Sequence, residues 1–184
     1  MAFNVRIKTD ENVFAGLAKQ NMLFHQCVIE LVDNAFAAPR KNVKPTVNII
    51  FKPICDNEDY FDLYVIDNGL GISKHIIEEN LLQLGHMPVT NSRLNEHGFG
   101  FKNSLVTLSG GNGEWSLWTR DSKTGEKFYI NGPFKENIEV EDTNVAFPEV
   151  DSILDESEIS TIILVRVKKL MLKLFKEGEQ SPRI

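Results

Sequence analysis

The feature that most constrains the fold is a β-rich run that ends at two closely spaced glycines and is followed by a helix. Residues 60–66 are rich in β-branched and aromatic side chains, and the run 67–71 (DNGLG) follows them directly. Ser73 is a suitable N-cap for a helix that carries several Ile and Leu residues and is closed by Gly85. This order predicts a strand, a sharp reversal and a helix, with Asp67 at the end of the strand.

Periodicity along the rest of the chain predicts an α+β fold. Between residues 24 and 38 the apolar residues recur at three- and four-residue steps and Pro39 follows, which is typical of a long helix. A second helix is predicted at 101–108, a helix-like stretch at 10–19 and a short basic helix or tail at 168–176. Strands are predicted at 3–8, 46–51, 60–66, 115–120, 127–131 and 159–167. We therefore expect a two-layer α/β sandwich, in which helices cover one face of a mixed, mainly antiparallel sheet.

Length and composition indicate one globular domain, covering residues 1–184. The apolar share of 42% and the charged share of 25% are typical of soluble proteins. Cys27 and Cys55 are too few for a disulfide scaffold, which favours a reducing compartment. Neither a signal peptide nor an apolar run of membrane-spanning length of about 18 residues is present. The sequence therefore predicts a cytoplasmic protein that has no contact with membranes.

Acidic residues are concentrated in one segment, residues 132–158. Nine acids and a single lysine give it a net charge of −8, whereas the whole chain carries −6, so the remaining residues carry +2. The alternatives for this acidic insert are a solvated loop and a contact with a partner. The sequence contains no basic stripe of the kind that binds duplex DNA, so direct nucleic-acid binding is not supported.

Glu30 and Asn34 lie four residues apart on the long predicted helix, so their side chains project from the same face. A carboxylate suits a base that activates water, and a carboxamide oxygen suits Mg²⁺, which prefers a few oxygen ligands and retains several waters. The alternative is a solvated polar stripe on the helix surface.

Asp67 is the candidate for recognition of a nucleobase. Gly69 and Gly71 permit a sharp reversal and let a flat ligand approach the backbone. A carboxylate in this position can accept a hydrogen bond from the exocyclic amino group of adenine, whereas guanine presents a carbonyl at that position. An ordinary Asp-Asn-Gly turn is the alternative interpretation.

Residues 98–102 (GFGFK) are the candidate for phosphate binding. Gly98 and Gly100 precede a predicted helix, whose free N–H groups and positive dipole end attract anions, and Lys102 adds a positive charge. Phe101 lies between Gly100 and Lys102 in this run. The polar residues 86–97 before this run predict a mobile loop, and a flexible turn is the alternative for the glycines themselves. The spacing matches neither the phosphate loop nor the dinucleotide-binding glycine motif.

Taken in order, these motifs resemble the ATP site of the GHKL superfamily, over roughly residues 24–167. Residues 30–35 (ELVDNA) are similar to its N-box, and residues 67–71 and 98–102 are similar to its two glycine boxes. Residues 160–164 (STIIL) are similar to its late strand. The superfamily includes gyrase B subunits, ninety-kilodalton heat-shock chaperones, histidine kinases, MutL proteins and MORC ATPases. The resemblance implies a Bergerat-type ATP-binding fold.

The resemblance also implies a role for each site residue. It assigns Glu30 as the base that orients the attacking water, Asn34 as the Mg²⁺ ligand and Asp67 as the contact to the adenine amino group. Residues 86–97 would form a lid. The further ATP contacts that it implies are Gly69, Gly71, Ile72, Gly98, Gly100, Phe101, Lys102 and Thr161.

Two positions differ from the superfamily pattern, Ala37, where an acid is usual, and Ser160, where glycine is common. The chain ends soon after the last predicted strand, without room for the transducer domain that supplies a catalytic lysine in many relatives. We therefore expect slow ATP hydrolysis to ADP and phosphate, with the lid coupling nucleotide state to a partner or an ATP-dependent homodimer. The motif style is nearest to MORC- or chaperone-type members. The alternative is a nucleotide-binding module, or a histidine-kinase-type domain, without useful hydrolysis.

Overall fold

The computed structural model describes residues 2–6, 22–81, 100–111 and 113–172. The predicted helix at 10–19, the lid at 86–97 and Gly98 lie outside these residues. The strands are β1 (Ala2–Arg6), β2 (Val47–Ile54), β3 (Asn57–Asp67), β4 (Trp115–Arg120), β5 (Lys127–Asn131), β6 (Asn137–Glu141) and β7 (Thr161–Lys168). The helices are α2 (Phe24–Ala37), α3 (Lys74–Ile76), the π-helical η1 (Ile77–Leu81) and α4 (Gly100–Leu108).

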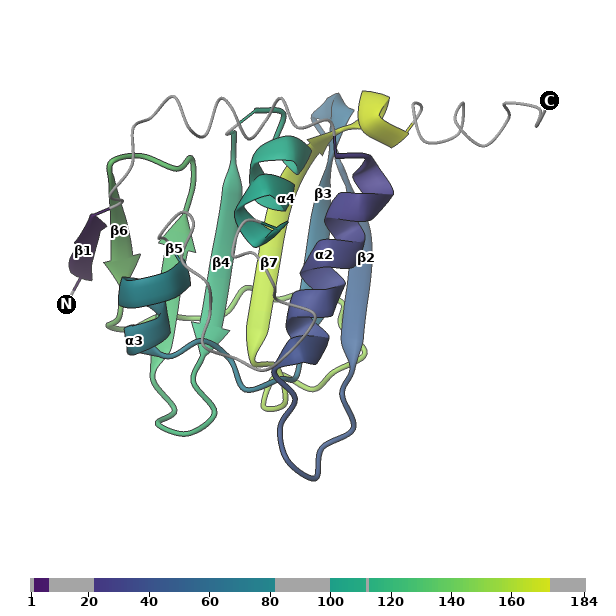
Figure 1. Ribbon diagram of the computed structural model, residues 1–184. Coiled ribbons are helices and arrows are strands. Elements are labelled where there is room, and N and C mark those ends of the chain that lie inside the picture. Colours follow the sequence, from purple (N-terminus) through teal and green to yellow (C-terminus); the bar gives the residue numbers. More distant parts are fainter. Residues whose placement is uncertain (1, 7–21, 82–99, 112, 173–184) are drawn as a thin grey trace.

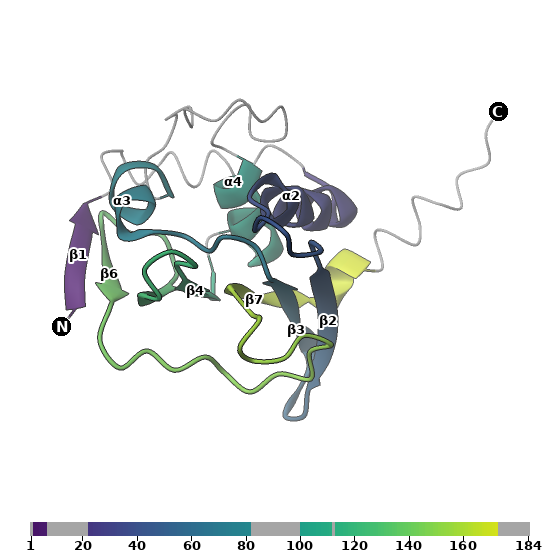
Figure 2. The ribbon, with the colours of Figure 1, turned by 90° about the horizontal axis from the view of Figure 1, so that it is seen from below.

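The seven described strands form one sheet in the order β1-β6-β5-β4-β7-β3-β2. Every pairing among them is antiparallel, so the parallel member of the expected mixed sheet is not among the described strands. Helices α2, α3 and α4 lie on the same face of the sheet, with α4 between the other two (Figures 1 and 2). The predicted two-layer α/β fold is therefore confirmed.

The main core lies between this helical layer and the sheet. Alternate side chains of the central strands point toward the helices, as the period of two in a strand requires. The fully buried residues at this interface include Leu31 of α2, Leu105 of α4, Leu63 of β3, Leu117 of β4 and Val165 of β7. Burying each such side chain contributes roughly 1.5–3 kcal/mol. The sheet and the two longer helices therefore form a rigid base for residues at their ends.

The opposite face of the sheet is partly covered by the chain between β6 and β7. Figure 2 shows this segment crossing the side of the sheet away from the helices. Its Phe147, Val150 and Leu154 pack in a second cluster with Ile66 and Ile162 of the central strands. The predicted acidic insert is thus more than a solvated loop, because it also contains β6 and a hydrophobic cover for the sheet.

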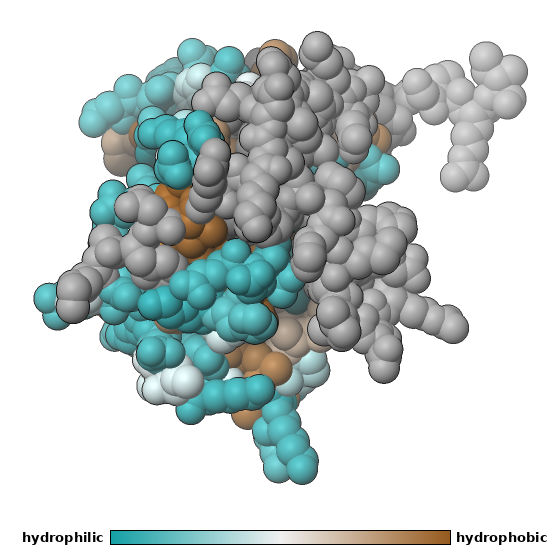
Figure 3. Space-filling view, turned by 60° about the vertical axis from the view of Figure 1, so that its left-hand side comes forward, coloured by the Kyte–Doolittle hydropathy of each residue, from teal (hydrophilic) through white to brown (hydrophobic). Residues whose placement is uncertain are grey.

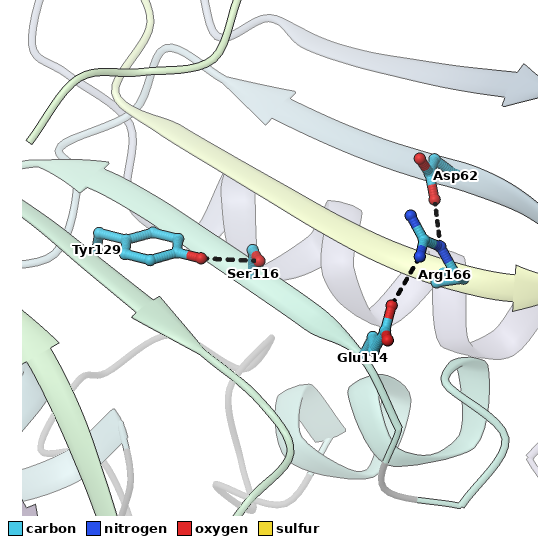
Figure 4. A network of polar contacts seen from close by, with 5 residues as sticks. All are labelled: Asp62, Glu114, Ser116, Tyr129 and Arg166. Atoms are coloured by element: carbon cyan, nitrogen blue, oxygen red, sulfur yellow. Dashed lines mark hydrogen bonds and ion pairs between the residues drawn. The ribbon is translucent and has the colours of Figure 1, made fainter. Parts of the chain in front are cut away.

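The remainder of the far face is polar. Arg166 donates hydrogen bonds to Asp62 at 3.2 Å and to Glu114 at 2.8 Å, and the Ser116 and Tyr129 hydroxyls are 3.4 Å apart (Figure 4). Exposed pairs of this kind contribute at most about 1 kcal/mol each. On the side that carries α3 and β6, the coloured part of the surface in Figure 3 is mainly hydrophilic, with small hydrophobic areas.

Several predicted boundaries differ in the structure. β2 and β3 extend to a tight turn at residues 55–56, so both strands are longer than the predicted strands at 46–51 and 60–66. Pro53 is tolerated there because β2 is an edge strand. The Ser73 hydroxyl accepts a bond from the Ile76 N–H at 3.4 Å, which confirms the predicted N-cap. Beyond α3 the helix widens into η1, and Gly85 lies outside the described residues.

No helix in the described parts of the chain is long and apolar enough to cross a membrane.

Candidate functional site

Asp67 is a buried carboxylate at the end of β3, with 8% of its surface exposed. The antiparallel register places it opposite Thr161, the first residue of β7. Its Oδ1 accepts a hydrogen bond from the Gly69 N–H at 2.8 Å, and the Thr161 hydroxyl also bonds to the carboxylate. Burial raises the pKa of Asp67 to about 6, opposed by these two hydrogen bonds and by the positive charge of Arg40. At neutral pH the group is therefore a mostly ionised acceptor with little water around it.

The glycines after Asp67 are required by close backbone packing. A Cβ on Gly69 would lie 2.8 Å from the Ala38 carbonyl oxygen and 3.0 Å from Asp67 Oδ1. Gly71 has φ of 69°, and a Cβ there would overlap the Arg120 carbonyl oxygen. Between them, the Leu70 N–H donates to the Ala38 carbonyl at 2.8 Å. The turn is thus held between the end of α2 and the end of β4.

Three hydroxyl side chains support this turn from the neighbouring strands. Thr119 of β4, which is fully buried, accepts from the Ile72 N–H at 2.8 Å and lies 3.4 Å from the Thr161 hydroxyl. Ser160 donates from its hydroxyl to the Gly69 carbonyl at 2.5 Å and from its N–H to the Asp67 carbonyl at 2.8 Å. Ile72 itself is half-buried against the main core. These contacts fix the backbone on both sides of Asp67.

Sequence reasoning missed Thr119 and gave Ser160 only as a departure from a pattern. Thr119 follows Trp115 and Leu117 on the inward face of β4, so a threonine in this apolar alternation was the available signal. Nothing in the sequence pairs it with Ile72, 47 residues earlier.

Glu30 projects from α2 toward the start of α4, and Asn34 lies one turn further along the same side of α2. The Asn34 amide nitrogen donates to the Glu30 carbonyl at 2.6 Å, which holds the carboxamide and leaves its oxygen as an available acceptor. The Glu30 carboxylate lies against Gly100, where an added Cβ would overlap Oε2. Within the described residues, no three His, Cys, Asp or Glu side chains gather into a cation site. Among the described residues, the Asn34 oxygen is the candidate ligand for a metal here, together with oxygens of a bound ligand.

The first turn of α4 carries Gly100, Phe101 and Lys102. Phe101 packs half-buried against the main core, whereas Lys102 is 2% exposed and its Nζ donates to the Asn80 carbonyl of η1 at 3.4 Å. Burial lowers the pKa of Lys102 to about 8. A buried ammonium near a helix N-terminus is a favourable setting for an anion.

The structure thus arranges the described candidates in two connected groups. Asp67, Gly69, Gly71, Ile72 and Thr161 surround the glycine turn, and Glu30, Asn34, Gly100, Phe101 and Lys102 lie where α2 meets α4. Helix α2 links the groups, since its C-terminal end contacts Gly69 and its middle contacts Gly100. One group offers a buried hydrogen-bond acceptor, and the other offers a carboxylate, a carboxamide oxygen and an ammonium.

Comparison with known protein families identifies the family of this domain. The family of histidine kinase-, DNA gyrase B-, and HSP90-like ATPases matches residues 19–136, more than half of the chain. The chain therefore belongs to this family, and it is an ATP-binding domain of the GHKL type. A search of curated protein sequences gives no significant match. The matched range ends before β7, so the position of Thr161 beside Asp67 rests on the strand register and on the bond from its hydroxyl to the carboxylate.

Proposed function

We propose that the domain binds Mg²⁺-ATP and hydrolyses it slowly, with Asp67 reading adenine and Glu30 orienting the attacking water. The observation that carries the proposal is the buried Asp67 carboxylate, which bonds to Gly69 and Thr161 at the edge of a turn that admits only glycine. A carboxylate has about four acceptor positions, so these two bonds leave capacity for a further donor.

Selection of the base follows from the chemistry of that acceptor. The adenine amino group donates a hydrogen bond to Asp67, whereas the guanine carbonyl would face a buried carboxylate, acceptor against acceptor. Leaving a buried acceptor unpaired costs roughly 1–3 kcal/mol, and more when it is charged. Ile72 and the glycine backbone would pack near the ring.

On the phosphate side, Lys102 and the N-terminus of α4 at Gly100 would bind the phosphate oxygens, together with Gly98 and Phe101. Asn34 would hold Mg²⁺ through its amide oxygen, because its nitrogen is already bonded to Glu30. One protein oxygen fits an ion that takes its other ligands from water and phosphates. The ion would neutralise charge on the phosphates when bound.

Hydrolysis would then depend on the Glu30 carboxylate, which lies beside Gly100 at the start of α4. Residues 86–97 would act as a lid that couples nucleotide state to a partner or to a second copy of the chain. We assign all of residues 1–184 to this one domain and expect slow turnover in a cytoplasmic, MORC- or chaperone-like protein.

The test of adenine reading is Asp67→Asn, measured by calorimetry with ATP and GTP. The change replaces a charged acceptor by a neutral amide, so ATP affinity should fall roughly 10- to 100-fold, the equivalent of about 1.4–2.8 kcal/mol. Asp151→Asn is the matched control, because Asp151 is exposed and lies in the segment before β7. Equal affinity of the Asp67→Asn variant and wild type would sink the adenine assignment.

The test of hydrolysis is Glu30→Ala, measured as phosphate release at saturating ATP. The variant should still bind ATP, but its phosphate release should stop. Release that persists in the variant would place the base elsewhere. If wild type binds ATP and releases no phosphate, the non-hydrolysing module is correct. Label that moves from ATP to a protein partner would favour the kinase-type reading.

A further inference from the structure

Arg40 connects three segments around the adenine-reading carboxylate without being part of any of the site motifs. It lies just beyond the end of α2, and its Nε donates to the Asn68 carbonyl at 2.7 Å. Its Nη2 donates to the Glu158 carbonyl, in the turn just before β7. Both acceptors are main-chain oxygens, so the guanidinium holds backbone positions.

The Asn68 carbonyl belongs to the peptide unit that binds Asp67. The N–H of that same unit, on Gly69, donates to Asp67 Oδ1 at 2.8 Å. Because a trans peptide is planar, its C=O and N–H point in opposite directions, and fixing one fixes the other. Arg40 therefore holds one end of the peptide whose other end holds the carboxylate. A charged donor on the carbonyl also polarises the unit and strengthens the N–H bond beyond it.

The rest of the turn is fixed independently of Arg40. The Asn68 side chain accepts from the Thr46 N–H at 2.8 Å and donates to the Lys44 carbonyl at 3.0 Å. Among the described residues, Arg40 is the group seen to bond the Asn68 carbonyl, and Asn68 is 5% exposed. Loss of Arg40 would thus leave a buried carbonyl without this donor and free the peptide to rotate.

We propose that Arg40 is a positioning residue for the nucleotide site, which sets the direction of the Asp67 carboxylate by fixing the peptide between Asn68 and Gly69. Arg40 acts through that peptide and contacts no nucleotide. This inference rests on the proposed function and extends that function to a residue outside the GHKL motifs.

The charge of Arg40 gives the proposal a second readout. Arg40 is the charged group that acts on Asp67 within the described part of the chain. The other groups that face the carboxylate are the neutral Gly69 N–H and the Thr161 hydroxyl, with Thr119 behind it. Removing the charge should raise the pKa of Asp67 above its value of about 6, a change that loss of packing alone would not produce.

The experiment compares Arg40→Met, Arg40→Lys and Arg120→Met in the full 184-residue chain. Arg120 is the matched control, because its side chain binds the Ser157 carbonyl at 2.6 Å and the Ile159 carbonyl in the same turn but does not reach Asn68. The Asp67 titration is followed by carboxyl-carbon NMR without ligand, and Mg²⁺-ATP binding by calorimetry.

Arg40→Met should raise the Asp67 midpoint and weaken ATP roughly tenfold. Arg40→Lys keeps the positive charge but loses the two-pronged guanidinium donor. The Asp67 titration midpoint should therefore stay near the wild-type value, while the affinity for ATP falls about threefold. Arg120→Met should leave the midpoint in place and affinity within about twofold of wild type.

Unchanged midpoint and affinity in Arg40→Met would overturn the proposal. If Arg40→Met does not fold, Arg40→Lys provides the test. An ATP affinity of Arg40→Lys equal to that of Arg120→Met would also overturn the proposal. Wild type that fails to bind ATP would refute the proposed function instead, while the ligand-free titration would still test the link between Arg40 and Asp67.

Discussion

Asp67 and Glu30 are both acidic residues of the helical side of the molecule, but the protein holds them in different ways. Asp67 is enclosed by backbone. Its neighbours are the Gly69 N–H, the Ser160 N–H on its own carbonyl, and a turn pressed against the Ala38 and Arg120 carbonyls. The Glu30 carboxylate, by contrast, is at the end of a flexible side chain and lies in the space left by the missing Cβ of Gly100 at the start of α4.

This contrast determines which end of the candidate site can adapt. Backbone contacts between strands cannot move without breaking the sheet, whereas a glutamate can change rotamer at a cost of order 1 kcal/mol. If Asp67 reads adenine and Glu30 serves the phosphates, as proposed, a rigid adenine end and an adjustable phosphate end would suit a site that selects one base and responds to the state of the phosphates. Changes at the two ends should therefore differ strongly in their effect on the free energy of unfolding.

Gly71→Ala should have the largest effect. The new Cβ would overlap the Arg120 carbonyl oxygen at a residue with φ of 69°, and β4 cannot withdraw without breaking its pairing with β7. We expect a loss of more than about 4 kcal/mol in urea unfolding, the range of severe backbone and core defects. Gly110→Ala is the matched control, because φ is 78° and nothing lies within 4 Å of the added Cβ. Equal losses in both variants would show that the left-handed backbone, and not the close contact, sets the cost.

The rigid end was only half predictable from sequence. Asp67, Gly69 and Gly71 are close together in the chain, so turn chemistry and strand patterning were sufficient to predict the turn, while the role of Asp67 came from the resemblance to the GHKL glycine box. Thr119, Ser160 and Arg40 are distant from the turn in sequence, and their contacts exist only once β4 and β7 pair beside β3. β6 was missed for another reason. Ile138 and Val140 alternate correctly, but the exposed acids that follow each of them, Glu139 and Glu141, made the segment look like a loop.

The ionisation of Asp67 should give the next largest effect. Its pKa is about 6 in the folded chain and 3.8 ordinarily, so between these values the native state binds more protons than the unfolded state. Stability without ligand should therefore fall as pH rises from about 4 to about 6, by up to about 3 kcal/mol. Asp67→Asn removes the ionisation, so the variant should exceed wild type in stability at pH 7 and approach it near pH 4. Parallel pH profiles from urea unfolding would contradict a buried, desolvated carboxylate at the rigid end.

Gly100→Ala should have the smallest effect on stability and a clear effect on activity. The added Cβ meets the far end of the Glu30 side chain, which can rotate away, and alanine favours a helix over glycine by about 1 kcal/mol. The free energy of unfolding should therefore change by less than about 1 kcal/mol. Displacing the carboxylate by about an ångström should still slow phosphate release roughly tenfold or more, because catalysis is sensitive to small misplacements. Release at saturating ATP, measured beside ATP affinity, separates this from weaker binding. A stability loss as large as that of Gly71→Ala would mean that Glu30 is locked in place, and the contrast between the two ends of the site would then disappear.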